Sequence, residues 1–188
     1  MRRRFAEAKA PKMDRPPAND GVFKIADGRA GRKGRKMIEQ KLARLGIVLP
    51  AAAVPAFQYV PVTVHERQAF VSGQLPREGD EVRIVGKVGG EVGIERAQEA
   101  ARLCILQGLA CLKQALGSLD RIERILKVTG FVASAPMFNQ QPKVIDAASE
   151  LLVQIFGENG RHARSAIGVA ELPRNACVEI EMIVALRP

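Results

Sequence analysis

The stretch ACVEIEMIVA (176–185) alternates along its length with a period of two. Successive side chains of a β-strand point to opposite faces, so this alternation predicts a strand. One face carries Val178, Ile180, Met182 and Val184, and the other carries Cys177, Glu179, Glu181 and Ile183. The stretch therefore predicts a strand with an apolar face toward a core and a second face that carries two carboxylates.

Two longer stretches, 94–116 and 141–156, repeat their apolar residues with the spacing of a helix. Each has one apolar stripe to bury, and Gly117 ends the first. The expected inward residues are Ala97, Ala101, Cys104, Ile105, Leu109, Leu112 and Leu116 in the first helix, and Val144, Ile145, Ala148, Leu151, Leu152 and Ile155 in the second. Cys104 and Cys111 lie near the buried side of the first helix, so we interpret both as packing residues.

Shorter apolar runs complete the expected fold. We expect strands at 59–64, 69–73, 126–132 and 165–169, a short strand at 82–85, and a short amphipathic helix from Met37 to Gly46. A polar turn at 65–68 joins the first two strands into a hairpin. The order from the hairpin onward is ββαβαββ, which predicts an α+β fold with both helices on one face of a mixed sheet. The opposite face of the sheet stays uncovered. Because this face carries the apolar residue Ile183, we expect a partner subunit to cover it.

The positive charge of the chain is concentrated at its start. Residues 1–36 hold twelve Lys and Arg against four Asp and Glu, whereas residues 37–188 hold seventeen against sixteen. The first segment also has few apolar residues and no period, so we expect a disordered extension ahead of one domain over 37–188. Three interpretations of the extension stay open: a true start at Met37, a solvated tail, or a basic arm that touches nucleic acid or acidic lipid.

The composition of the domain excludes several classes of protein. Its near-neutral charge and single Tyr do not provide the basic groove and stacking aromatics of a nucleic-acid-binding domain, so any such contact is expected from the tail. No apolar run is long enough to span a bilayer. Three cysteines without a CxxC pair, and two histidines, argue against a disulfide framework or a metal site. We therefore expect a cytoplasmic protein with reduced thiols.

Arg164 is the first candidate functional residue, because it stands among Ala163, Ser165 and Ala166. Small neighbours leave room and exposed backbone donors beside a guanidinium that binds a carboxylate through two hydrogen bonds. The alternative is an arginine that simply points to water at a junction between helix and strand. Glu179 is a candidate acid or base if its strand passes a cleft, and is otherwise a solvated strand residue.

Other polar and glycine-rich features have simpler interpretations. The glycines of GKVGGEVG (86–93) match no phosphate-binding motif and predict a flexible loop. Cys177 stands at the start of a strand, without an evident triad partner, and is interpreted as a packing residue. His162, two residues before Arg164, is interpreted as a surface histidine, although its position would also suit support of a bound anion.

Three stretches together resemble a known family: FVSGQLP (70–76), LKVTGFV (126–132) and ARSAIGVAELPRNACVEIEMIVAL (163–186). They are similar to the Rid family, also called the YjgF family, whose members include enamine and imine deaminases and proteins labelled L-PSP endoribonucleases. The resemblance implies a chorismate-mutase-like fold and a homotrimer with clefts between subunits. It also implies hydrolysis of 2-aminoacrylate-type intermediates to 2-oxo acids and ammonia by a 2-iminobutanoate/2-iminopropanoate deaminase-like hydrolase, without metal or cofactor.

The same resemblance assigns roles to individual residues. Arg164 would bind the carboxylate of the substrate, and Glu179 would position or activate water. The expected substrate-binding residues are Tyr59, Ser72, Ser149, Arg164, Ser165 and Ala166. Ala166 stands where deaminating members have a cysteine, and Ser149 stands in for a pocket asparagine on the second helix. These two departures motivate an alternative function, a non-catalytic trimer that binds a small carboxylate or regulates through it, with ribonuclease activity ranked below both.

Overall fold

The structure is a computed structural model that describes residues 37–52 and 58–188. The disordered extension expected over 1–36 lies outside the described residues. Across the described part of the chain, no helix is both long enough and apolar enough to cross a membrane.

Five strands form the main sheet, and two long helices pack on it. The strands are β1 (Val62–His65), β2 (Gln68–Gln74), β5 (Ile122–Ala133), β6 (Ala163–Val169) and β7 (Val178–Leu186). The helices are α1 (Met37–Arg44), α2 (Ile94–Leu116) and α3 (Gln141–Phe156), with short 3-10 turns η1 (Leu119–Arg121), η2 (Gly157–Gly160) and η3 (Pro173–Asn175). A small separate hairpin consists of β3 (Arg77–Glu78) and β4 (Glu81–Val82).

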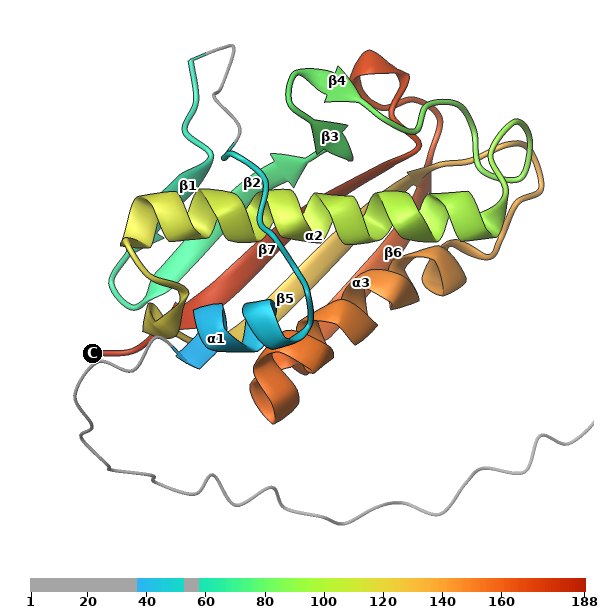
Figure 1. Cartoon of the computed structure of the whole chain (residues 1–188). Helices are drawn as coiled ribbons and strands as arrows, with labels where there is room; N and C mark the ends of the chain where they lie inside the picture. The colour runs from blue at the N-terminus through green and yellow to red at the C-terminus, as the bar shows by residue number, and fades with distance from the viewer. Residues whose placement is uncertain (1–36, 53–57) are drawn as a thin grey trace, which may run out of the picture. The chain divides into compact units, whose positions relative to one another are not determined.

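The main sheet has the order β1-β2-β7-β5-β6. β5 and β6 run parallel, and the other neighbouring strands run antiparallel. Figure 1 shows α2 and α3 side by side across one face of this sheet. The arrangement confirms the α+β fold, the ββαβαββ order and the placement of both long helices on one face of a mixed sheet.

The side chains of β7 alternate between the two faces of the sheet, as its period of two predicts. Its four apolar residues on the helix side are at most 2% exposed: Val178, Ile180, Met182 and Val184. Cys104 and Cys111 of α2 are buried with them. The opposite face, which we call the open face, carries no helix of the described chain, and Phe70 of β2 is 41% exposed there.

Glycine at position 130 lets α3 approach the sheet closely. A Cβ on Gly130 would overlap the side chain of Ile145, which is fully buried on α3. Because Ile145 lies one turn before Ser149, this contact also sets the height of Ser149 above the sheet.

Several element ends differ from their prediction. β5 begins at Ile122 rather than at residue 126, and the hairpin begins at Val62 rather than at residue 59. The expected strand at 82–85 is interrupted, because β4 ends at Val82 and Val85 forms only an isolated bridge to Ala176.

β6 also begins earlier than predicted, at Ala163. Arg164 therefore lies inside a strand rather than in the loop before it, because its backbone is paired with Val128 of β5.

Candidate functional site

Arg164 lies on β6 at the edge of the sheet, and its side chain is held by α3. In the parallel register it stands beside Val128, whose side chain is buried on the helix side. One terminal nitrogen, Nη1, donates hydrogen bonds to Asp146 Oδ1 at 2.9 Å and to Ser149 Oγ at 2.9 Å. These two bonds use both N–H groups of Nη1 and fix one end of the guanidinium against α3.

The other edge of the same guanidinium is available to a ligand. Within residues 37–52 and 58–188, no hydrogen bond reaches Nε or Nη2 of Arg164. The side chain is 26% exposed and borders a shallow hollow of ≈ 400 Å³. The hollow is lined by Asn139, Gln140, Pro142, Lys143, Asp146 and Arg164. Two parallel N–H groups at a half-exposed edge match the geometry of a carboxylate.

His162 completes this contact from the turn before β6. Its Nδ1 lies 2.7 Å from the carbonyl oxygen of Gly160, and its Nε2 lies 3.1 Å from Ser149 Oγ. Burial lowers the pKa of His162, and the positive charges of Arg164 and Lys127 lower it further, against the opposing effect of the Gly160 hydrogen bond. The lowered pKa favours the neutral imidazole, and the ring is half-buried, which corrects the interpretation of His162 as a simple surface residue.

Glu179 lies on the open face of β7, opposite Phe131 of β5. A Cβ on residue 73 would overlap the carboxylate of Glu179, so Gly73 leaves room for this side chain. Burial raises the pKa of Glu179, and the neighbouring Glu181 raises it further. A carboxyl group with a raised pKa is suited to accept and return a proton near neutral pH.

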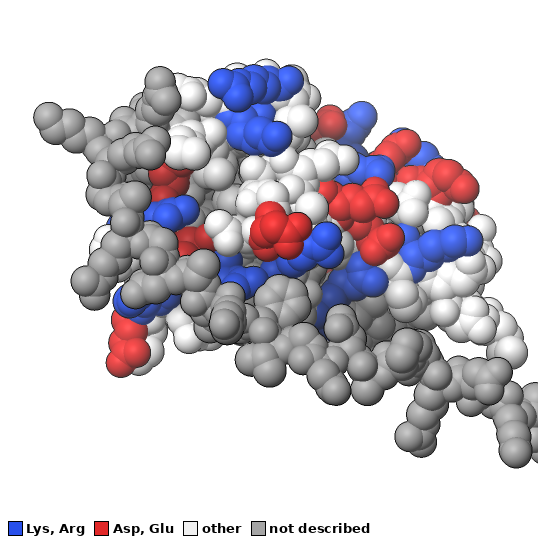
Figure 2. Space-filling model, turned by 90° about the horizontal axis from the view of Figure 1, so that it is seen from below, with Lys and Arg blue, Asp and Glu red and all other residues white. Residues whose placement is uncertain are grey.

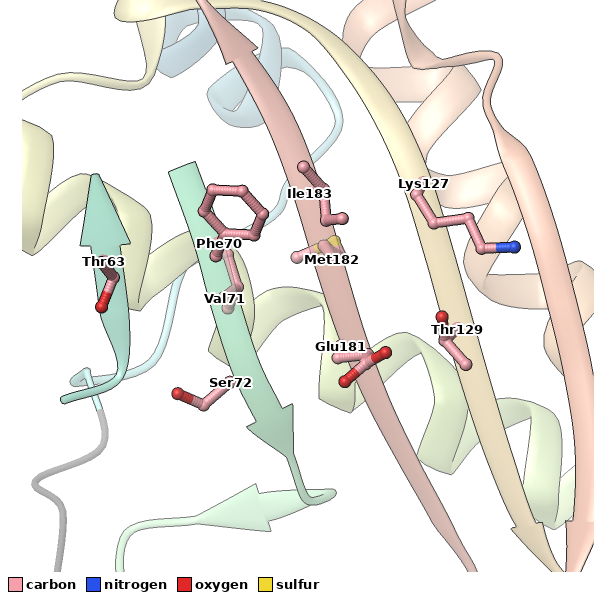
Figure 3. Close-up of a pocket in the computed structure, with 9 residues that line it drawn as sticks. All are labelled: Thr63, Phe70, Val71, Ser72, Lys127, Thr129, Glu181, Met182 and Ile183. Carbon is pink, nitrogen blue, oxygen red and sulfur yellow. The ribbon is translucent and has the colours of Figure 1, made fainter. Parts of the chain in front are cut away.

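A second hollow, of ≈ 290 Å³, opens on the same face. Its lining comes from β1, β2, β5 and β7 (Figure 3): Thr63, Phe70, Val71, Ser72, Lys127, Thr129, Glu181, Met182 and Ile183. Figure 3 shows Glu181 and Thr129 side by side on paired strands. The Ser72 hydroxyl donates to the carbonyl oxygen of Val60 at 2.7 Å, and Lys127 Nζ donates to Ser165 Oγ at 2.7 Å.

The expected site residues fall into two groups within one chain. Arg164 and Ser149 are in contact, and Ala166 shares their side of β6, because alternate residues of a strand share a face. Ser165 and Ser72 belong to the open face, as does Glu179. One chain alone therefore does not bring Arg164 and Glu179 into a common pocket.

Tyr59 and Cys177 have no direct part in either group. Tyr59 precedes β1, is exposed, and does not line the hollow of the open face. Cys177 is fully buried, and burial raises the pKa of its thiol to about 12, which keeps the thiol protonated. Its interpretation as a packing residue is confirmed.

Asp146 and Lys127 are polar contacts that sequence reasoning did not identify. Asp146 precedes Ser149 by three positions on α3, so the two side chains share a helix face. That spacing was the available signal, but only the packing of α3 on β6 shows that both side chains meet Arg164. No group of three or more His, Cys, Asp and Glu side chains in the described chain is arranged to hold a metal ion.

Charges on the face seen in Figure 2 are interspersed, with Lys and Arg beside Asp and Glu. This agrees with the near-neutral count for residues 37–188 and provides no single basic surface on that face.

Comparison with known proteins gives consistent results. Residues 39–186 match the family described as "YjgF/chorismate_mutase-like, putative endoribonuclease". The chain is 45% identical over 150 residues to Protein TCP17 of Trypanosoma cruzi, covering 79% of this chain and 94% of that protein. It is 32% identical over 140 residues to a 2-iminobutanoate/2-iminopropanoate deaminase of Dermatophagoides farinae, covering 74% of this chain and 94% of that one.

Among solved structures, Atu1372 of Agrobacterium tumefaciens, a protein of unknown function, is 47% identical with a TM-score of 0.74. The match covers 80% of this chain and 93% of that one. The family match runs from within α1 to the end of β7. The chain belongs to the YjgF family.

Proposed function

We propose that this protein hydrolyses 2-imino acids, formed from enamines of the 2-aminoacrylate type, to 2-oxo acids and ammonia. The observation that carries the proposal is Arg164, whose Nη1 is held by α3 while its Nε–Nη2 edge stays available to a carboxylate. The deaminase of Dermatophagoides farinae, a relative over most of the domain, supports the choice of reaction. The burial of Cys104 and Cys177 as free thiols supports action in the cytoplasm.

In this mechanism Arg164 binds and orients the carboxylate next to the C=N bond. Water adds across that bond, so the carbon gains a hydroxyl group and the nitrogen gains a proton. The adduct then loses ammonia as the C–O bond becomes C=O. Glu179 takes a proton from the attacking water and returns one to the departing nitrogen, so no net proton is consumed. Its raised pKa favours both halves of this exchange.

We infer that the reaction takes place between subunits of a homotrimer. Arg164 lies on the helix side of the edge strand β6, whereas Glu179 lies on the open face of β7. Cyclic symmetry lets the Arg164 edge of one copy face the Glu179 side of the next. The exposed Phe70 on the open face supports burial of that face against other copies.

The proposal is tested by ammonia release from freshly generated 2-aminoacrylate. We expect the wild-type protein to accelerate release, and Arg164→Ala to lower kcat/KM by about 100-fold, because the carboxylate loses its orientation. Arg161→Ala is the matched control: this arginine is 68% exposed and pairs with Glu158, so its loss leaves the rate unchanged. Equal rates for the wild type and Arg164→Ala would refute the proposal.

A non-catalytic trimer that binds a small carboxylate is the second candidate. The observation that favours it is Ala166, the small apolar residue on the Arg164 side of β6 where deaminating relatives are expected to have a cysteine. Such a protein would be stabilised against heat by a 2-oxo acid, since ligand binding to the native state raises apparent stability. It would release no ammonia above the uncatalysed rate.

Ribonuclease activity ranks below both candidates. Residues 37–188 are nearly neutral and contain one Tyr. RNA affinity that disappears on removal of residues 1–36 would assign any such binding to the basic segment.

A further inference from the structure

Four groups form a continuous chain of hydrogen bonds behind the carboxylate edge of Arg164. The chain runs from the Gly160 carbonyl oxygen to His162, from His162 to Ser149, and from Ser149 to Arg164. We propose that His162 is a positioning residue for ligand binding: as a neutral imidazole it fixes the Ser149 hydroxyl, which in turn holds the Arg164 guanidinium in its carboxylate-binding orientation. This inference rests on the proposed function of Arg164.

The direction of each hydrogen bond follows from its neighbours. A carbonyl oxygen only accepts, so the 2.7 Å contact with Gly160 places the proton of neutral His162 on Nδ1. Nε2 then carries a lone pair and accepts from the Ser149 hydroxyl at 3.1 Å. With its proton directed at His162, Ser149 Oγ presents its lone pairs to Arg164 Nη1 at 2.9 Å. For a neutral ring, this is the one arrangement that satisfies all three hydrogen bonds.

This arrangement matters because the other anchor of Nη1 is weak. Asp146 is 58% exposed, and an ion pair with such an exposed carboxylate is screened by water. Ser149 is half-buried and fixed on the rigid helix α3, so it is the better defined of the two anchors. Without the imidazole as its acceptor, the Ser149 hydroxyl can turn its proton toward Arg164 Nη1, which weakens Ser149 Oγ as an acceptor for Arg164.

Protonation of His162 would reverse one bond of the chain. An imidazolium donates from Nε2, so the Ser149 oxygen would accept from two cationic N–H groups, and the positive charges of His162 and Arg164 would repel each other. Lys127 on β5 and Arg164 on β6 both place positive charge near the ring, and both oppose its protonation.

Acidic residues close in sequence to His162 and Ser149 are already paired. On η2 and the residue after it, Glu158 and Arg161 pair with each other at 3.0 Å. On α3, Asp146 is bound to Arg164. Neither carboxylate is left to stabilise a charged His162, so the imidazole stays neutral at physiological pH.

The first test is independent of any ligand. Nitrogen NMR of the full-length protein at pH 7.5 should show His162 as the Nδ1–H tautomer, with a titration midpoint below the ordinary value of about 6.5. Ser149→Ala should leave that tautomer in place, because the Gly160 carbonyl fixes it. A dominant Nε2–H tautomer in the wild type would overturn the proposal.

The second test uses two variants and pyruvate as the 2-oxo acid probe. His162→Gln places an amide oxygen within reach of the Ser149 hydroxyl, whereas His162→Leu provides no acceptor. We expect His162→Leu to weaken pyruvate binding about tenfold and His162→Gln to keep it within about threefold of wild type, on the scale of one hydrogen bond. Equal weakening in both variants would overturn the positioning role. Circular dichroism checks that each variant folds.

The pH dependence of pyruvate affinity distinguishes a positioning role of His162 from a simple loss of its packing contacts. Wild-type affinity for pyruvate should fall as the pH drops from 7.5 to 5, through the titration of His162, while His162→Gln should show no such fall. Parallel profiles for the two proteins would overturn the proposal. Absence of any pyruvate binding by the wild type would instead refute the proposed function of Arg164. The tautomer of His162 measured by NMR would then still test the hydrogen-bond chain by itself.

Discussion

We expect replacement of Arg164, the proposed carboxylate-binding residue, to lower carboxylate affinity by an amount that follows from the geometry of its side chain. The available Nε–Nη2 edge offers two hydrogen bonds to a carboxylate, and a hydrogen bond to a charged group contributes about 1.5–3 kcal/mol. The side chain is 26% exposed and shares its charge with Asp146, so water and the carboxylate of Asp146 reduce the full sum. We therefore expect Arg164→Ala to cost about 3 kcal/mol, which is roughly 100-fold in Kd.

Arg164→Lys separates charge from geometry. Lysine keeps the positive charge but presents a point donor in place of the planar fork, so we expect an intermediate loss of about tenfold. Isothermal titration calorimetry with pyruvate measures both variants against Arg161→Ala, whose exposed side chain already pairs with Glu158. Retention of wild-type affinity by Arg164→Ala, or an equal loss in Arg161→Ala, would exclude Arg164 as the carboxylate-binding residue.

Three other changes have expected outcomes. The pKa of Glu179 is raised by burial and by Glu181, so the stability that its protonated form contributes is present at low pH and is lost as the pH rises through that pKa. Glu179→Gln should therefore gain stability relative to wild type in urea unfolding between pH 4 and pH 7, and parallel curves would contradict this sign. Gly130→Ala should lower the free energy of unfolding by about 1–3 kcal/mol, because the added Cβ overpacks against Ile145. Adding Ile145→Val should recover part of this loss, and additive effects of the two substitutions would exclude the contact. Asp146→Asn keeps a hydrogen-bond acceptor for Arg164 but removes a carboxylate that competes with the ligand for its positive charge. Pyruvate should therefore bind a few-fold more tightly, and weaker binding would contradict this competition.

Periodicity predicted the long elements of this fold because it records which side of each element is buried. The spacing of apolar residues alone predicted the four inward residues of β7 and the bounds of α2 and α3. The apolar side of each of these elements packs into the same core. Gly117 marked the end of α2 correctly, and its left-handed φ of 79° is the conformation that glycine adopts most easily.

The candidate site could be predicted only in part. A resemblance of local sequence identified Arg164 and Ser149, and the two side chains are indeed in contact. Asp146 was missed and His162 was interpreted as a surface residue, because their contacts with Arg164 and Ser149 depend on the packing of α3 against β6, which the sequence pattern does not encode. Arg164 itself was expected in a loop, because a charged residue among small ones carries no strand signal, whereas pairing with β5 extends the strand through it.

Mixed trimers test whether Arg164 of one subunit and Glu179 of another form one site, as we propose. Arg164→Ala and Glu179→Gln should each be inactive alone. In trimers formed by co-expressing equal amounts of the two variants, each mixed trimer contains one site with both residues intact, so about a quarter of wild-type ammonia release should return. If both residues served the same site from the same chain, no intact site would form. Activity would then stay at the level of the single variants, which would exclude a site shared between subunits.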